Sequence, residues 1–141
     1  MSNKRKRNAN FKPFESRTLN SRYVRITESM LKSKAWKELD PYEHSAYLSF
    51  KLKYFERRTD GSDNRKNISL TYEEMKPVMS PDRFKKCIDN LIKYGFIDIV
   101  EHRPQTRNAT IYGFSDRWHK YGTDDFKEHQ RVRLSRRKKD T

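Results

Sequence analysis

A clear amphipathic run begins at Ser80 and ends at Gly95. Its apolar residues recur three or four positions apart, the period of one helix face: Phe84, Ile88, Leu91 and Ile92. Ser80 followed by Pro81 is a typical helix start, and glycine commonly lies just past a helix end in a left-handed conformation. The pattern predicts a helix over residues 82–94, with Cys87 beside its buried face.

Two helices are predicted upstream of this run. Asp40 followed by Pro41 marks the start of a helix that we expect to reach about Arg58. A shorter helix is expected to begin at Thr27 or Glu28. The apolar residues assigned to the core from these segments are Met30, Leu31, Ala35, Trp36, Leu39, Tyr47, Leu48, Phe50, Tyr54 and Phe55.

A short helix is also predicted after Thr71, because Glu74 stands three residues on, the spacing of a capping box. Its expected inward residues are Met75, Val78 and Met79. Brief strands are expected at residues 23–26, 68–70, 96–100 and 109–114, the last two flanking a basic loop. Ser115 or Asp116 is expected to cap a final helical piece that contains Trp118 and Tyr121.

This order of elements predicts an α+β fold, a winged helix-turn-helix. Its parts would be a three-helix core, a two- to three-stranded antiparallel wing, and short extra helices at both ends. We expect the folded domain to occupy residues 23–122. A basic arm, expected to be disordered, would precede it at 1–22, and a basic tail would follow it at 123–141.

The formal net charge of +14 is concentrated at the two ends of the 141-residue chain. Residues 1–22 carry +6 and residues 126–141 carry +5, which leaves +3 for residues 23–125. Such ends favour polyanion binding, because every neutralised phosphate releases counterions. The alternative is that they only keep the chain soluble.

Signals for enzymatic chemistry are absent from the sequence, so we expect no enzyme, no metal and no cofactor. The histidines are scattered, at His44, His102, His119 and His129, without the spacing of a zinc site or a His-x-His pair. Phosphate-binding glycine motifs are missing. A single cysteine, Cys87, fits a reducing cytoplasm, and neither a membrane-length apolar stretch nor a secretory signal is found.

The polar side of the helix at 82–94 holds the candidate DNA contacts. A helix that reads a major groove must bury one face and present the other. The residues nominated to contact bases are Ser80, Asp82, Arg83, Lys86 and Asn90, and those nominated to contact the backbone are Lys85 and Lys93. An ordinary solvated helix face is the alternative interpretation.

Two further segments are candidates for backbone or minor-groove contact. The predicted wing carries Arg103, Gln105, Thr106, Arg107 and Asn108. The N-terminal arm carries Lys4, Arg5, Lys6 and Arg7. The start of the helix after Thr71 is a candidate phosphate site, and Trp36, Trp118 and Tyr121 are candidates for base stacking. Core packing or a dimer contact is the favoured explanation of these aromatics.

The segment VMSPDRFKKCIDNLIKYGFI, residues 78–97, resembles the recognition helix and first wing strand of winged helix-turn-helix proteins. A wider pattern is similar to small bacterial winged-helix proteins of plasmids, phages and integrative conjugative elements. The residues that carry it are Ser29, Leu31, Ser33, Ala35, Trp36, Trp118, Lys120, Tyr121 and Gly122.

This resemblance implies sequence-specific binding to double-stranded DNA. The role it implies is that of an origin-binding accessory protein in conjugative transfer or replication, with a relaxase or replication protein as a further partner. Three alternatives stay open: a transcription regulator of such an element, an RNA-binding protein, and a module that docks another protein. The sequence leaves open whether the chain binds as a monomer or a dimer.

Overall fold

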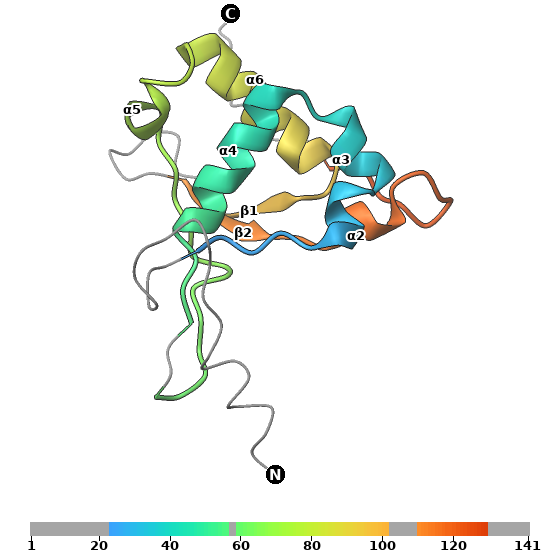
Figure 1. Cartoon of the computed structure of the whole chain (residues 1–141), viewed down its shortest axis with the longest axis horizontal. Helices are drawn as coiled ribbons and strands as arrows, with labels where there is room; N and C mark the ends of the chain where they lie inside the picture. Colours follow the sequence, from blue (N-terminus) through green and yellow to red (C-terminus); the bar gives the residue numbers. More distant parts are fainter. Residues whose placement is uncertain (1–22, 57–58, 102–109, 130–141) are drawn as a thin grey trace, which may run out of the picture.

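The computed structural model describes residues 23–56, 59–101 and 110–129 (Figure 1). These residues form five α-helices, one two-stranded antiparallel sheet and one 3-10 helix, an α+β arrangement compatible with a winged helix. The elements, in chain order, are α2 (Glu28–Leu31), α3 (Lys34–Glu38), α4 (Pro41–Leu52), α5 (Tyr72–Met75), α6 (Pro81–Lys93), β1 (Ile97–Glu101), β2 (Ile111–Phe114) and η1 (Arg117–Lys120).

Helix α6 forms where its sequence pattern predicts. The hydroxyl of Ser80 accepts a hydrogen bond from the Arg83 N–H at 3.2 Å, which caps the first turn. Beyond the last turn Gly95 adopts a φ of +90°. A Cβ at Gly95 would lie 2.6 Å from the backbone nitrogen of Trp118, so both conformation and space require glycine there.

The core lies where α4 packs across α6, with the sheet against the same region (Figure 1). Helix α6 contributes Cys87, Ile88, Leu91 and Ile92, all at most 2 % exposed. Aromatic rings fill much of the remaining volume in edge-to-face contacts, such as Tyr47 with Phe96 at 5.5 Å between ring centres. The other buried apolar residues are Met30, Ala35, Trp36, Leu39, Ala46, Phe50, Ile68, Leu70, Met75, Met79, Ile97, Tyr112 and Trp118.

Helix α4 is shorter than its sequence pattern predicts, because it ends at Leu52 and not near Arg58. Asn64, from the returning loop, donates its side-chain amide to the Lys53 carbonyl at 2.8 Å and accepts the Phe55 N–H at 2.8 Å. These bonds satisfy backbone groups that a longer helix would use. The expectation that Leu31, Leu48 and Phe55 are buried is also wrong, since they are 47 %, 41 % and 47 % exposed.

Two of the expected strands do not form as strands. Residues 23–26 form no strand and pair with no neighbouring strand in the described part of the chain. Residues 68–70 are reduced to one bridge, in which Ile68 exchanges backbone hydrogen bonds with Tyr112 at 2.9 and 2.7 Å. Strands β1 and β2 do pair, with Ile97 opposite Phe114 and an irregularity between Ile99 and Glu101.

Helix α5 has the predicted capping box between Thr71 and Glu74. Met75 and Met79 are buried as expected, but Val78 is 48 % exposed. The helix ends at Met75 and a turn follows, in which the Val78 N–H bonds to the Met75 carbonyl at 2.8 Å. That turn directs Val78 away from the core.

The segment after β2 is tied to the rest of the fold by Arg117. Its guanidinium donates to the carboxylate of Asp98 and to the carbonyl oxygens of Ile92 and Ile97 at 2.9 and 3.3 Å. It therefore joins the end of α6 to the start of β1. The start of η1 is held by Ser115, whose hydroxyl accepts the Arg117 N–H at 3.1 Å, whereas Asp116 makes no side-chain capping bond.

Candidate nucleic-acid interface

Helix α6 has one buried face and one face turned to solvent. The buried face anchors the helix in the core through Cys87, Ile88, Leu91 and Ile92. The solvent face begins with Asp82 and continues with Lys85 and Lys86, all exposed. About two turns further on, Lys93 is half-buried, and its ammonium lies 5.3 Å from the ring centre of Tyr94.

Lys85 and Lys86 are the two most available cations among the nominated residues of this helix. Both are exposed, and neither forms an ion pair with any residue in the described part of the chain. They are adjacent in sequence, near the middle of the helix. An incoming phosphate or base edge would meet these ammonium groups without first displacing a partner from the described ranges.

Arg83 is turned toward α4. Its guanidinium lies 3.2 Å from the carboxylate of Asp40 and 4.9 Å from the ring centre of Tyr42. The ion pair is partly exposed, with the side chains of Arg83 and Asp40 37 % and 40 % accessible. Arg83 can therefore reach a ligand only in competition with Asp40.

The expectation that Asn90 lies on the outward face is wrong. Asn90 is half-buried between α4 and α6, and its side-chain amide donates to the carboxylate of Glu43. Glu43 is only 3 % exposed, and its other oxygen accepts the Asp40 N–H at 2.9 Å. A buried carboxylate needs such donors, so the structure engages Asn90 inside the protein.

Ser80 and Asp82 occupy the exposed start of α6. The Ser80 hydroxyl serves as the helix cap, so its oxygen is engaged while its proton can still be donated. Asp82 lies in the first turn, where a carboxylate complements the helix dipole. Asp82 also adds negative charge beside Lys85 and Lys86, which lowers the net charge of this face.

The candidate contacts of the wing and the arm lie outside the described residues. These are Arg103, Gln105, Thr106, Arg107 and Asn108 in the wing and Lys4, Arg5, Lys6 and Arg7 in the arm. The described parts of the wing are its two strands, which lead toward and away from residues 102–109.

The chain's net positive charge lies outside the described residues. The described residues hold 16 Lys/Arg and 17 Asp/Glu, a net charge of −1. Residues 1–22, 57–58, 102–109 and 130–141 together hold 17 Lys/Arg and two acids, a net charge of +15. The described part of the fold is thus almost neutral, and the basic character comes from the segments around it.

The tryptophans are core residues. Trp36 is 9 % exposed and stacks on His44 at 4.1 Å, and Trp118 is 6 % exposed and stacks on Phe96 at 5.9 Å between ring centres. The start of α5 is engaged as well, because the Glu74 carboxylate accepts the Thr71 N–H at 2.9 Å and pairs with Lys53. Neither feature presents an open stacking surface or a free helix terminus.

Sequence reasoning missed Asp40 and Tyr42 as the neighbours of Arg83, and Glu43 as the acceptor of Asn90. The local pattern identifies Asp40 as a helix cap, but its partner Arg83 lies 43 residues further along the chain. Separations of this size have no periodic signal. They become visible only when α4 and α6 are placed against each other.

The described residues contain no group of three or more His, Cys, Asp or Glu side chains able to hold a metal ion. Over the same ranges, every helix is too short or too polar to span a lipid bilayer. No family model, curated protein or solved structure matches the chain.

Proposed function

We propose that the protein binds duplex DNA through α6, with Lys85 and Lys86 facing the major groove. The observation that carries this proposal is the pair of exposed lysines without internal partners in the described ranges, on a helix whose opposite face is buried. A helix held this firmly can present side chains to base edges in a fixed geometry. Arg83 joins them when it leaves Asp40.

Because the described residues are nearly neutral, we expect sequence preference and affinity for DNA to come from different parts of the chain. Sequence preference would come from α6, and much of the affinity would come from the basic residues at 1–22, 102–109 and 130–141. Phosphate contacts from such residues add affinity without distinguishing sequences. The proposal therefore expects strong salt dependence on every duplex.

The resemblance to winged-helix proteins of mobile elements extends this proposal to a role at a transfer or replication origin. A relaxase or a replication protein would then be recruited beside the bound site. A regulator would make the same DNA contacts but occupy promoters. Mapping the bound sites in cells separates the two roles, because origin-proximal and promoter sites lie in different places.

The deciding experiment starts with selection of bound sequences from random duplexes by the full chain. Lys86→Ala and Lys85→Ala are then compared on the selected site and on a scrambled duplex by fluorescence anisotropy. We expect Lys86→Ala to cost about 1–3 kcal/mol on the selected site and much less on the scrambled duplex. Lys37→Ala, an exposed lysine on α3, serves as the matched control.

Two outcomes would contradict the proposal. The first is an equal effect of Lys86→Ala and Lys37→Ala, which would mean that only overall charge matters. The second is a structured RNA that competes with the selected duplex at equal or higher affinity and is insensitive to Lys86→Ala. Either result would remove α6 as the reading element.

A further inference from the structure

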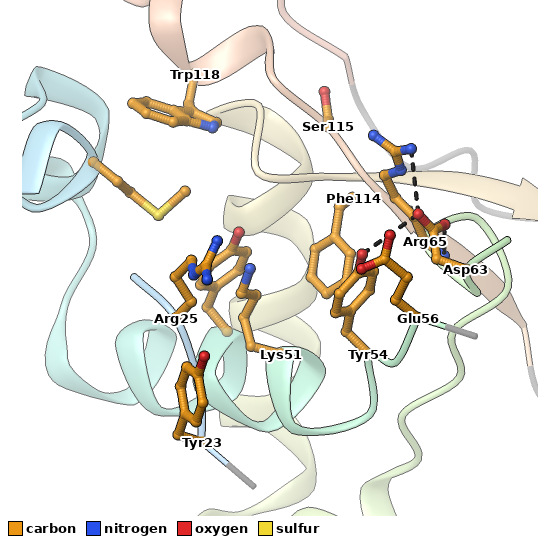
Figure 2. A pocket seen from close by; sticks show the side chains of 12 residues that line it. Tyr23, Arg25, Lys51, Tyr54, Glu56, Asp63, Arg65, Phe114, Ser115 and Trp118 are labelled. Carbon is orange, nitrogen blue, oxygen red and sulfur yellow. Dashed lines mark hydrogen bonds and ion pairs between the residues drawn. The ribbon is translucent and has the colours of Figure 1, made fainter. Parts of the chain in front are cut away.

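A pocket of about 620 Å³ lies on the side of α4 near its C-terminal end (Figure 2). It is formed by α2 and the segment before it, by α4 and the loop after it, and by the end of β2 and η1. None of the described residues lining it belongs to α5 or α6, so it is separate from the proposed duplex-binding face. The lining residues are Tyr23, Arg25, Met30, Tyr47, Lys51, Tyr54, Glu56, Asp63, Arg65, Phe114, Ser115 and Trp118.

Two cations, Arg25 and Lys51, stand next to each other in this pocket (Figure 2). Neither forms an ion pair with a carboxylate in the described ranges. Burial lowers the pKa of Lys51, and the neighbouring Arg25 charge lowers it further. Arg25 is exposed and Lys51 is half-buried, so a bound anion that contacted both would relieve their mutual repulsion.

The wall beside these cations is aromatic. The Lys51 ammonium lies 5.3 Å from the ring centre of Phe114 and 5.8 Å from that of Tyr54. Tyr47 and Trp118 lie behind these rings and are buried, so the rings that a ligand can stack on are the half-buried Tyr54 and Phe114. Such a wall accommodates a flat ring, since stacking on aromatic side chains is favourable for nucleobases and other planar groups.

Carboxylates mark the other end of the pocket. Asp63 accepts a hydrogen bond from the Tyr54 hydroxyl at 3.4 Å and pairs with Arg65 at 3.3 Å, as the dashed lines in Figure 2 show. Glu56 is exposed and forms no ion pair with a described residue. Its oxygens can therefore accept N–H groups from a ligand.

We propose that this pocket binds a nucleotide, with the phosphate between Arg25 and Lys51, the base against Tyr54 and Phe114, and base amino groups donating to Glu56. The volume lies in the usual range for small-molecule sites, roughly 300–1,000 Å³. The order cation, aromatic, carboxylate along the pocket matches the order phosphate, ring, exocyclic amine in a nucleotide. The ligand is a free mononucleotide or the phosphorylated end of a single strand, which share this chemistry.

The test titrates the full chain with AMP, CMP and UMP, with the matching nucleosides and with inorganic phosphate, by calorimetry and by tryptophan fluorescence. Trp118 lines the pocket and reports directly on its occupation. Nucleotides should bind at least about tenfold more tightly than nucleosides or phosphate, since each lacks one of the two recognised parts. AMP and CMP should bind more tightly than UMP, which has no exocyclic amine.

Variants locate the binding. Lys51→Met keeps the aliphatic stem beside Phe114 and should weaken nucleotide binding about tenfold or more, as should Arg25→Gln. Lys37→Met, on α3, should leave it unchanged. Lys51→Met should also leave duplex binding on the selected site unchanged, which separates this proposal from that for α6. A 5′-phosphorylated tetranucleotide that binds more tightly than AMP identifies a strand end as the ligand, and the reverse order identifies a free nucleotide.

The proposal is overturned if phosphate or nucleosides bind as tightly as nucleotides, or if no nucleotide binds. It is also overturned if Lys51→Met and Lys37→Met have the same effect. Circular dichroism shows whether Lys51→Met folds. If it does not, the proposal is still tested by comparing the affinities of the unmodified chain for nucleotides, nucleosides and phosphate.

Discussion

The guanidinium of Arg83 on α6 lies 3.2 Å from the carboxylate of Asp40, the residue that caps α4. The pair links a candidate DNA-binding side chain to the helix that supports it. Asp40 both holds α4 in place and neutralises a cation that duplex DNA would otherwise attract.

Replacing Asp40 by Asn should therefore strengthen duplex binding. Asparagine is as good a helix cap as aspartate, so Asp40→Asn removes the charge and retains the cap. A partly exposed ion pair contributes up to about 1 kcal/mol, so the affinity for duplex DNA should increase by up to that amount. Fluorescence anisotropy measures this increase. The increase should vanish in an Arg83→Ala background. Asp124→Asn, at an exposed acid near the end of the described chain, controls for net charge, and an equal increase there would contradict the competition.

Asn90 should behave as a structural residue. Asn90→Ala leaves the buried Glu43 carboxylate without one of its donors, which should lower the free energy of unfolding by about 1–3 kcal/mol. Urea denaturation measures this decrease. At a temperature where the variant is folded, its preference between the selected and scrambled duplexes should match that of the unmodified chain. A changed base preference would instead indicate that Asn90 contacts the bases of the duplex.

Salt dependence tests the role of the N-terminal arm. Changing Lys4, Arg5, Lys6 and Arg7 to Gln should weaken binding to every duplex alike. The slope of log K against log salt should become shallower by about 0.9 for each phosphate that the arm no longer neutralises. Anisotropy titrations at several salt concentrations give this slope. If the same substitutions instead abolished sequence preference, the arm and not α6 would be the element that contacts the bases.

The two glycines Gly95 and Gly61 form a matched pair for stability. Both have positive φ, +90° and +73°, but a Cβ at Gly95 would meet the backbone of Trp118, whereas nothing lies within 4 Å at Gly61. Gly61→Ala should cost about 1–2 kcal/mol for its conformation alone. Gly95→Ala should cost at least about 3 kcal/mol, because the clash adds to that effect. Equal unfolding free energies of the two variants would show that the close approach of Gly95 to η1 is dispensable.

Cys87 should be unreactive in the folded protein. Burial, with a smaller contribution from Glu43, raises the pKa of its thiol to about 12 from an ordinary 9.0. At about pH 8 the thiolate fraction is then about a thousandfold lower than for an ordinary thiol. Disulfide-exchange reagents should modify the folded chain far more slowly than the guanidinium-unfolded chain. A fast reaction in the folded state would mean that α6 is not anchored on this face.

Local patterns predicted the helices well where the signals were themselves local. Ser80, Thr71 and Asp40 each cap a helix, and the bonds involved span three residues. The end of α4 could not be predicted in this way. It depends on Asn64, which binds the backbone around residues 53–55 from the far side of a loop. Apolar spacing likewise assigned Leu48 and Val78 to a core that does not reach them.

The amino-acid sequence alone was enough to predict that α6 is a helix with one apolar and one polar side. It also predicted that most of the net positive charge lies in the segments on either side of a nearly neutral central region. Both follow from composition and from interactions within a few residues. The packing of α4 against α6 was needed to show which polar residues of α6 face solvent and which face α4. Arg83 and Asn90 meet partners 43 and 47 residues away. The period of one helix cannot report the direction from which a second helix packs against it.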